Sequence, residues 1–224
     1  LDPRRLRRLA TTHTNLFGRT LLLMAAYFLM VASASRLGEI ALAANAIILH
    51  FWHLTAYSVD GVAFATETLV GNALGAGDAA LAHRLARRSM VWGVVLALLY
   101  SATYLLATRP LAGLFTTDLA VIAAVEGVAL LTVLAMPVNA VAFIYDGVFI
   151  GANDMPYLFR QMSVSFVLVF LPALGILVHL LDGGLAGLWL AMVLFMAARA
   201  VTLHWRYRQP AWMDGRQAEA LRGG

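Results

Sequence analysis

The feature that most constrains this chain is a series of long apolar runs that are almost free of charge. A chain that crosses the hydrocarbon core of a bilayer forms a helix of about 20 apolar residues, because only its own backbone satisfies its hydrogen bonds there. Six runs have this length, at roughly 16–34, 42–74, 89–108, 120–145, 161–181 and 185–205. The composition agrees, since 62% of the residues are apolar and 12% are charged, against about 45–50% and about 25% in soluble domains. We predict an all-α integral membrane protein, a bundle of six transmembrane helices.

The connections between these runs differ in their content of arginine. The arginine-rich connections hold Arg4, Arg5, Arg7, Arg8, Arg84, Arg87, Arg88, Arg160, Arg206 and Arg208. The opposite connections hold only Arg36 and Arg109. The positive-inside rule makes the arginine-rich side cytoplasmic, so that both ends lie inside and the number of spans is even. The predicted domains are a cytoplasmic basic segment (1–15), a six-helix transmembrane bundle (16–207) and a cytoplasmic tail (208–224).

Several classes of site and partner are excluded by composition. The chain has no cysteine, which rules out disulfides and thiolate metal sites. No basic patch alternates with aromatic residues, so we expect contact with membrane lipids and not with nucleic acid. Glycines spaced by four predict close packing of helices at Gly71/Gly75, Gly147/Gly151 and Gly183/Gly187. Tryptophans near predicted helix ends are expected to anchor the interface: Trp52, Trp92, Trp189, Trp205 and Trp212.

The second apolar run carries two acids, Asp60 and Glu67. A carboxylate at the centre of a bilayer costs about 2.5–3.5 kcal/mol, so an intramembrane acid is a functional candidate by default. Seven residues make nearly two helical turns, which places both acids on one side of the helix together with His53, and Tyr57 borders the same side. We call His53, Tyr57, Asp60 and Glu67 the acidic stripe and expect it to face water or other helices.

The fourth run repeats this spacing with Thr132, Asn139 and Asp146. Thr132 and Asn139 also fit a simpler role as hydrogen-bond partners between helices. Arg19 and Arg199 lie near the cytoplasmic ends of the first and sixth runs, where we expect their side chains to snorkel to the interface and not to bind substrate.

Two segments resemble a known family. YSVDGVAFATETLVGNALGAG at 57–77 resembles the eighth transmembrane helix of MATE multidrug exporters, particularly the DinF-like branch, and DGVFIGAND at 146–154 looks like the end of their tenth helix. The resemblance implies one lobe, the C-terminal one, of a twelve-helix transporter in the bacterial inner membrane. The N-terminal six-helix bundle would be its partner.

The same resemblance implies a function. MATE transporters export organic cations and other amphipathic drugs or metabolites, coupled to inward movement of protons or sodium ions by rocking of two bundles. Asp60, Glu67, Asp146 and Asn139 would face the central cavity or the bundle interior. The first run has no carboxylate and Asn139 replaces an acid of some relatives, which argues against a sodium site of their type. The acid most often linked to proton coupling belongs to the other lobe.

Three other functions remain open. A lipid-linked oligosaccharide flippase of the same superfamily would need more basic residues in its cavity, because its cargo carries pyrophosphate. An intramembrane enzyme is not favoured: HExxH and GxSxG are absent, and His53 and Asp60 lie two turns apart with no nucleophile nearby. We therefore expect no catalytic residue, metal or cofactor. A purely structural subunit would tolerate neutral replacements at Asp60 and Glu67.

Overall fold

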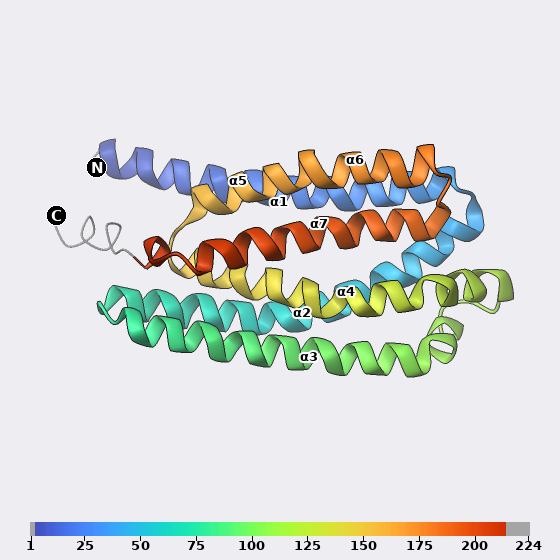
Figure 1. Cartoon of the computed structure of the whole chain (residues 1–224), viewed down its shortest axis with the longest axis horizontal. Helices are drawn as coiled ribbons and strands as arrows, with labels where there is room; N and C mark the ends of the chain where they lie inside the picture. The colour runs from blue at the N-terminus through green and yellow to red at the C-terminus, as the bar shows by residue number, and fades with distance from the viewer. Residues whose placement is uncertain (1–2, 214–224) are drawn as a thin grey trace.

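The computed structural model describes the backbone of residues 3–213 and the side chains of residues 10, 12–210 and 212–213 (Figure 1). The described elements are α1 (Pro3–Arg36), α2 (Glu39–Gly75), α3 (Ala79–Gly113), α4 (Leu119–Gly151), α5 (Met155–Ser165), η1 (Phe166–Phe170), α6 (Leu171–Leu174), η2 (Gly175–Leu180), α7 (Gly184–Tyr207) and η3 (Pro210–Trp212). Within this part of the chain, six helical stretches are long and apolar enough to span a membrane, as predicted. The start of α1 and the end of α7 lie at the same end of the bundle, which agrees with an even number of spans.

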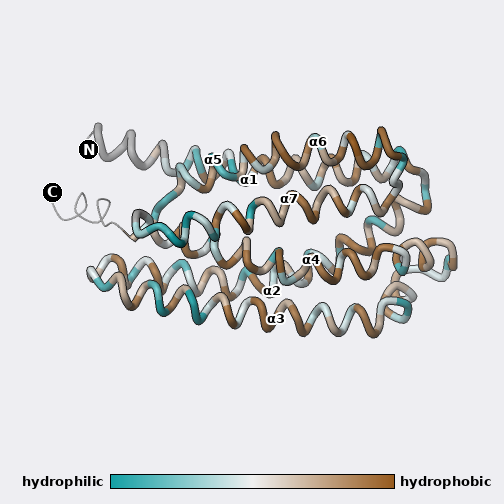
Figure 2. The backbone as a smooth tube through the Cα atoms, viewed as in Figure 1, coloured by the Kyte–Doolittle hydropathy of each residue, from teal (hydrophilic) through white to brown (hydrophobic). Residues whose placement is uncertain are grey.

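Hydrophobic side chains cover the outside of the bundle as well as its core. Hydrophilic residues gather towards the end that holds the α2–α3 turn (Figure 2). At 37 residues, α2 is about 55 Å long and exceeds the hydrocarbon core, so it is tilted in the membrane or extends beyond it. The basic segment predicted at 1–15 continues into the first membrane helix, because α1 begins at Pro3.

The fifth span is one continuous helical stretch with two π-helical segments, η1 and η2, on either side of α6. Pro172 lies in α6, where its ring clashes with the preceding turn and leaves a carbonyl without its usual donor. A wider π turn relieves such a clash without ending the helix. By contrast, α4 continues as one helix through Pro137.

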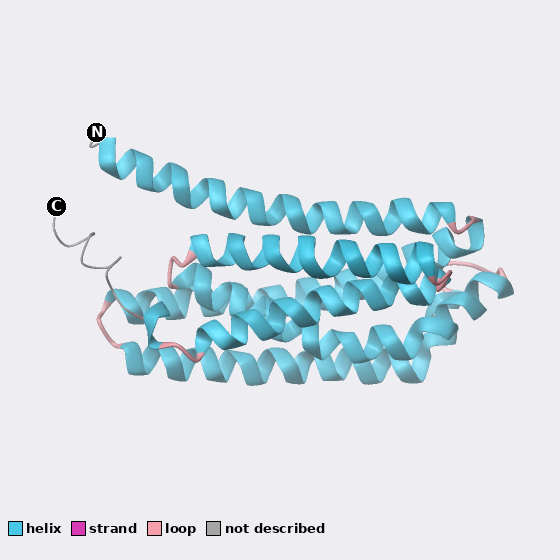
Figure 3. Ribbon diagram, turned by 45° about the horizontal axis from the view of Figure 1, so that its top comes forward, coloured by secondary structure: helices cyan, strands magenta, loops and turns pink. Residues whose placement is uncertain are grey.

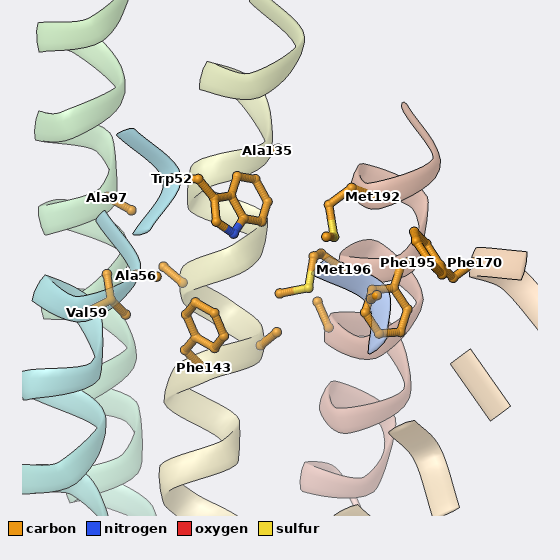
Figure 4. Packing of buried hydrophobic residues seen from close by; sticks show 14 of the residues in the cluster. Trp52, Ala56, Val59, Ala97, Ala135, Phe143, Phe170, Met192, Phe195 and Met196 are labelled. Atoms are coloured by element: carbon orange, nitrogen blue, oxygen red, sulfur yellow. The ribbon is translucent and has the colours of Figure 1, made fainter. Parts of the chain in front are cut away.

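The centre of the bundle is α4, which packs along α2, α3 and α7. Buried side chains between α2, α4 and α7 form its core, among them Trp52, Phe143, Phe195 and Met196 (Figure 4). α1 packs mainly against α5 and more sparsely against α2. It lies along one side of the bundle, and its first turns diverge from the other helices (Figure 3). α1 is therefore the least enclosed of the spans.

Close approach of α2 and α4 depends on two of the glycines that the spacing singled out. A Cβ atom at Gly147 would collide with the carbonyl oxygen of Ala63, and one at Gly151 would collide with that of Glu67. A Cβ atom at Gly187 would lie 2.7 Å from the carbonyl oxygen of Leu177, so the Gly183/Gly187 pair also marks a tight contact. The predicted role in packing is confirmed for Gly147/Gly151 and Gly183/Gly187. It is wrong for Gly75, where an added Cβ atom would meet no other atom within 4 Å.

We expect Gly147→Ala to lower the free energy of unfolding by about 1–3 kcal/mol, because the added methyl group forces two backbones apart. Gly127→Ala is the matched control on the same helix, since a Cβ atom there meets no other atom within 4 Å. The control should gain up to about 1 kcal/mol from helix propensity. Thermal unfolding of the purified protein in detergent measures both. Equal midpoints for the two variants would show that α2 and α4 are not in backbone contact.

The prediction that all five tryptophans anchor the interface needs correction. Trp52, Trp189 and Trp212 are buried, so only Trp92 and Trp205 fit the role of interfacial anchors. The Trp212 indole nitrogen donates to the carbonyl oxygen of Tyr207 at 2.9 Å, which satisfies the polar end of a large apolar ring inside the fold. The predicted tail thus begins as an ordered 3-10 turn, and its residues 214–224 lie outside the described part of the chain.

Candidate functional site

A buried cluster of three charges joins three helices. Asp146 on α4 accepts hydrogen bonds through Oδ2 from Arg19 on α1 and from Arg199 on α7, the latter at 2.6 Å. The side chain of Arg199 has no exposed surface. The prediction that both arginines snorkel is therefore wrong. Pairing with a buried carboxylate offsets the cost of removing their charges from water.

Apolar groups surround the Arg199 guanidinium. It lies 5.9 Å from the ring centroids of Phe143 and Phe195, and its Nη1 is 3.3 Å from the Met196 sulfur. The Nε atoms of both arginines and Oδ1 of Asp146 lack hydrogen-bond partners in the part of the chain that the structure describes. Two guanidinium groups share one carboxylate, so the three-residue contact carries excess positive charge.

Asp60 lies where it can balance that charge. Its carboxylate is half-buried and interacts electrostatically with Asp146, Arg19 and Arg199. Among the described residues it has neither an ion pair nor a hydrogen bond, and the same holds for Glu67, which is also half-buried. Asp60 and Glu67 are thus neither sealed in the core nor neutralised by a direct partner.

The aromatic members of the acidic stripe connect α2 to α1. His53 stacks on Tyr57 with ring centroids 5.7 Å apart and meets Tyr27 of α1 edge-on at 5.0 Å. The Trp52 indole nitrogen donates to the Tyr27 hydroxyl at 3.1 Å. Tyr57 itself is 68% exposed. The stripe is therefore an open, polar strip of surface next to α1, and the helical spacing had grouped its residues on one side of α2.

The fourth-helix residues that share a spacing of seven do not form one site. Asp146 belongs to the charge cluster, and Asn139 is buried with its Oδ1 unpaired among the described residues. The Thr132 hydroxyl donates to carbonyl oxygens of its own helix, at Ala129 and Val128. Thr132 is therefore not the partner between helices that we considered, because a threonine hydroxyl readily bonds to the preceding turn.

Sequence reasoning missed a pair of buried polar residues on one face of α5. Gln161 and Ser165 are buried, lie one helical turn apart on one face, and keep Gln161 Nε2 and Ser165 Oγ unpaired among the described residues. Thr202 of α7 contacts Gln161 weakly, at 3.4 Å between oxygens. The sequence could have indicated this polar face, since Gln161 and Ser165 interrupt the start of an apolar run at a spacing of four. A polar interior thus extends from α4 and α7 to α5.

This arrangement can attract and hold cations from the open side, where Asp60 and Glu67 lie, while the buried cluster ties α1, α4 and α7 together. No group of three or more His, Asp or Glu side chains with metal-binding geometry occurs within the described residues. The chemistry available is the attraction of charge and the exchange of protons or cations.

Comparisons with known proteins agree with this geometry. The sequence matches the MatE family over residues 16–174. It is 31% identical to "Protein DETOXIFICATION 44, chloroplastic" of Arabidopsis thaliana, over 85% of this chain and 36% of that protein. It is 30% identical to "DNA damage-inducible protein F" of Escherichia coli, over 89% of this chain and 44% of that protein. Among solved structures, a mutant of the Vibrio cholerae MATE transporter VcmN has the same fold, with a TM-score of 0.82 at 20% identity over 96% of this chain and 50% of that one. The chain spans less than half the length of these two curated relatives.

Proposed function

Because this chain belongs to the MatE family of multidrug and toxic compound efflux transporters, we propose that it forms one lobe of a secondary active exporter. The second lobe is another six-helix bundle, the N-terminal half of the same transporter. Substrates are organic cations or other amphipathic compounds, exchanged for protons or sodium ions as the two lobes rock. The proposed location is the bacterial inner membrane, with the arginine-rich end of the bundle in the cytoplasm.

One observation carries the proposal: the open acidic stripe on α2, next to a buried charge cluster. Asp60 and Glu67 are half-buried carboxylates without direct partners in the described part of the chain. Such acids are costly inside a membrane and persist where they face a water-filled pathway. Substrate and ion sites of secondary transporters lie near the midplane between their repeats, and the acidic stripe would contribute this lobe's side of such a site.

Charge favours an exporter over a flippase. A pyrophosphate-bearing cargo needs free guanidinium groups, yet Arg19 and Arg199 both bind Asp146. Within the apolar run 42–74, Asp60 and Glu67 of the acidic stripe have no direct partner among the described residues, and carboxylates attract cations. An intramembrane enzyme has no support from the family, whose members are transporters.

Accessibility to water tests the proposed pathway. Because this chain has no cysteine, single cysteines can be introduced without removing any from this lobe, in a complete transporter whose other lobe is also free of cysteine. We expect Tyr57→Cys and Phe64→Cys to react with a membrane-impermeant cationic thiol reagent and to be protected by an organic-cation substrate. Both side chains are exposed in this lobe. Tyr57 belongs to the acidic stripe, and Phe64 lies one helical turn from both Asp60 and Glu67 on the same side of α2.

Leu99→Cys is the control, since Leu99 is 61% exposed on α3 near the middle of the predicted apolar run 89–108, where the hydrocarbon core keeps a charged reagent away. Reaction at all three positions to the same extent, or at none of them, would show that the acidic stripe does not line an aqueous pathway.

A further inference from the structure

A groove between α2 and α3 has no part in the proposed pathway. Its volume is about 620 Å³, and its walls are mostly apolar, with Gly61 and Leu69 on α2 and Leu96 on α3. At 3.6 residues per turn, Gly61 and Leu69 lie about 100° and about 180° around α2 from Asp60. The groove therefore opens on a different side of the helix from the acidic stripe.

The groove is amphipathic along its length. Arg88 and Ser89 of α3 line it on the side of the arginine-rich end, and Trp92 follows one turn further into the apolar part. The predicted apolar span 89–108 begins directly after Arg88, which places the guanidinium at the level of lipid headgroups. Trp92 is 68% exposed, as is typical of a side chain at the boundary between headgroups and hydrocarbon.

The charge at this end is positive and uncompensated. Arg84, Arg87 and Arg88 are all exposed and have no ion pair among the described residues. The acid nearest in sequence, Asp78, caps α3 by accepting a hydrogen bond from the backbone nitrogen of Leu81 at 2.7 Å. Basic pockets between transmembrane helices bind anionic headgroups, and each arginine near an anionic surface contributes favourably.

We propose that the α2–α3 groove binds an anionic phospholipid. Arg88 and Ser89 donate hydrogen bonds to its phosphate, and an acyl chain lies along Gly61 and Trp92 towards Leu96. The combination of one charged end and an apolar channel matches a lipid with a charged head better than it matches a helix of the second lobe, which would need no positive charge at one end.

Gly61 offers a direct way to fill the groove. A Cβ atom at this position meets no other atom within 4 Å, so Gly61→Leu blocks the channel without a collision in the core. Gly127→Leu is the matched control in α4, where a Cβ atom also has open space. Arg88→Gln removes the headgroup contact, and Arg84→Gln is its control because Arg84 is exposed on the same helix but does not line the groove.

The experiment uses the complete protein in vesicles of phosphatidylcholine that contain about 10 mol% of a brominated lipid. Bromine quenches nearby tryptophan, and the Trp92 contribution is the difference from Trp92→Phe. We expect brominated phosphatidylglycerol to quench Trp92 with an about fivefold preference over brominated phosphatidylcholine. Arg88→Gln and Gly61→Leu should abolish this preference, while Arg84→Gln and Gly127→Leu keep most of it.

Three outcomes would overturn the proposal. Equal quenching by both lipids would show that the groove does not select a charge. An equal loss in Arg84→Gln and Arg88→Gln would mean that the arginines attract anionic lipid as a general surface. Absence of Trp92 quenching by either lipid in the complete transporter would mean that the second lobe, and not a lipid, fills the groove.

Discussion

Asp146→Asn is expected to lower the free energy of unfolding by about 3–5 kcal/mol, because it leaves buried charges without a counterion. The substitution keeps the shape of the side chain but removes its negative charge. Arg199, which has no exposed surface, then faces Arg19 with like charge across the gap that Asp146 had bridged. Thermal and denaturant unfolding of the purified protein in detergent, followed by tryptophan fluorescence, measure the loss.

Two variants separate this effect from a general sensitivity to substitution. The double variant Asp146→Asn/Arg199→Gln removes the fully buried charge together with its partner and should recover more than half of the lost stability. Glu126→Gln breaks the exposed pair with Arg109, whose atoms are 3.8 Å apart, and should change stability by less than about 1 kcal/mol. Equal effects of Asp146→Asn and Glu126→Gln would mean that Asp146 is not part of a buried ion pair.

The number and order of the spans followed from sequence because length and hydropathy alone decide whether a helix crosses a bilayer. The residues at which each span begins and ends were less predictable. The fifth span begins at Met155 and not near 161. Its first turns carry the polar residues Arg160, Gln161 and Ser163, so their mean hydropathy is too low for the sequence to mark them as part of a membrane span. The burial of Trp52 and Trp189 could not be predicted from sequence either, because a side chain facing lipid and one facing the core are equally apolar.

The charge cluster illustrates a second limit. Helical spacing shows which residues share one side of their own helix, as Asp60 and Glu67 do on the continuous helix α2. It does not show which neighbouring helix that side meets. Asp146 is 127 residues from Arg19 and 53 from Arg199, so their contact depends on how α1, α4 and α7 are arranged in space. Arg19 and Arg199, each taken alone, had a simpler explanation as snorkelling side chains at helix ends.

The central claim is that the acidic stripe on α2 belongs to the transport pathway. Efflux of a fluorescent organic cation from cells that express the complete transporter tests it, with wild type, Asp60→Asn and Glu126→Gln compared at several external pH values. Glu126 is an exposed carboxylate near the far end of α4 and serves as the control. All three proteins should reach the membrane in equal amounts.

We expect Asp60→Asn to slow efflux on the order of tenfold or more, since it removes a charged contact to the cation, and to weaken the dependence on pH, because an amide at this position neither takes up nor releases a proton. Glu126→Gln should behave as wild type. Unchanged efflux with an unchanged pH profile in Asp60→Asn would contradict the account, make Asp60 a structural residue, and place the coupling outside this stripe.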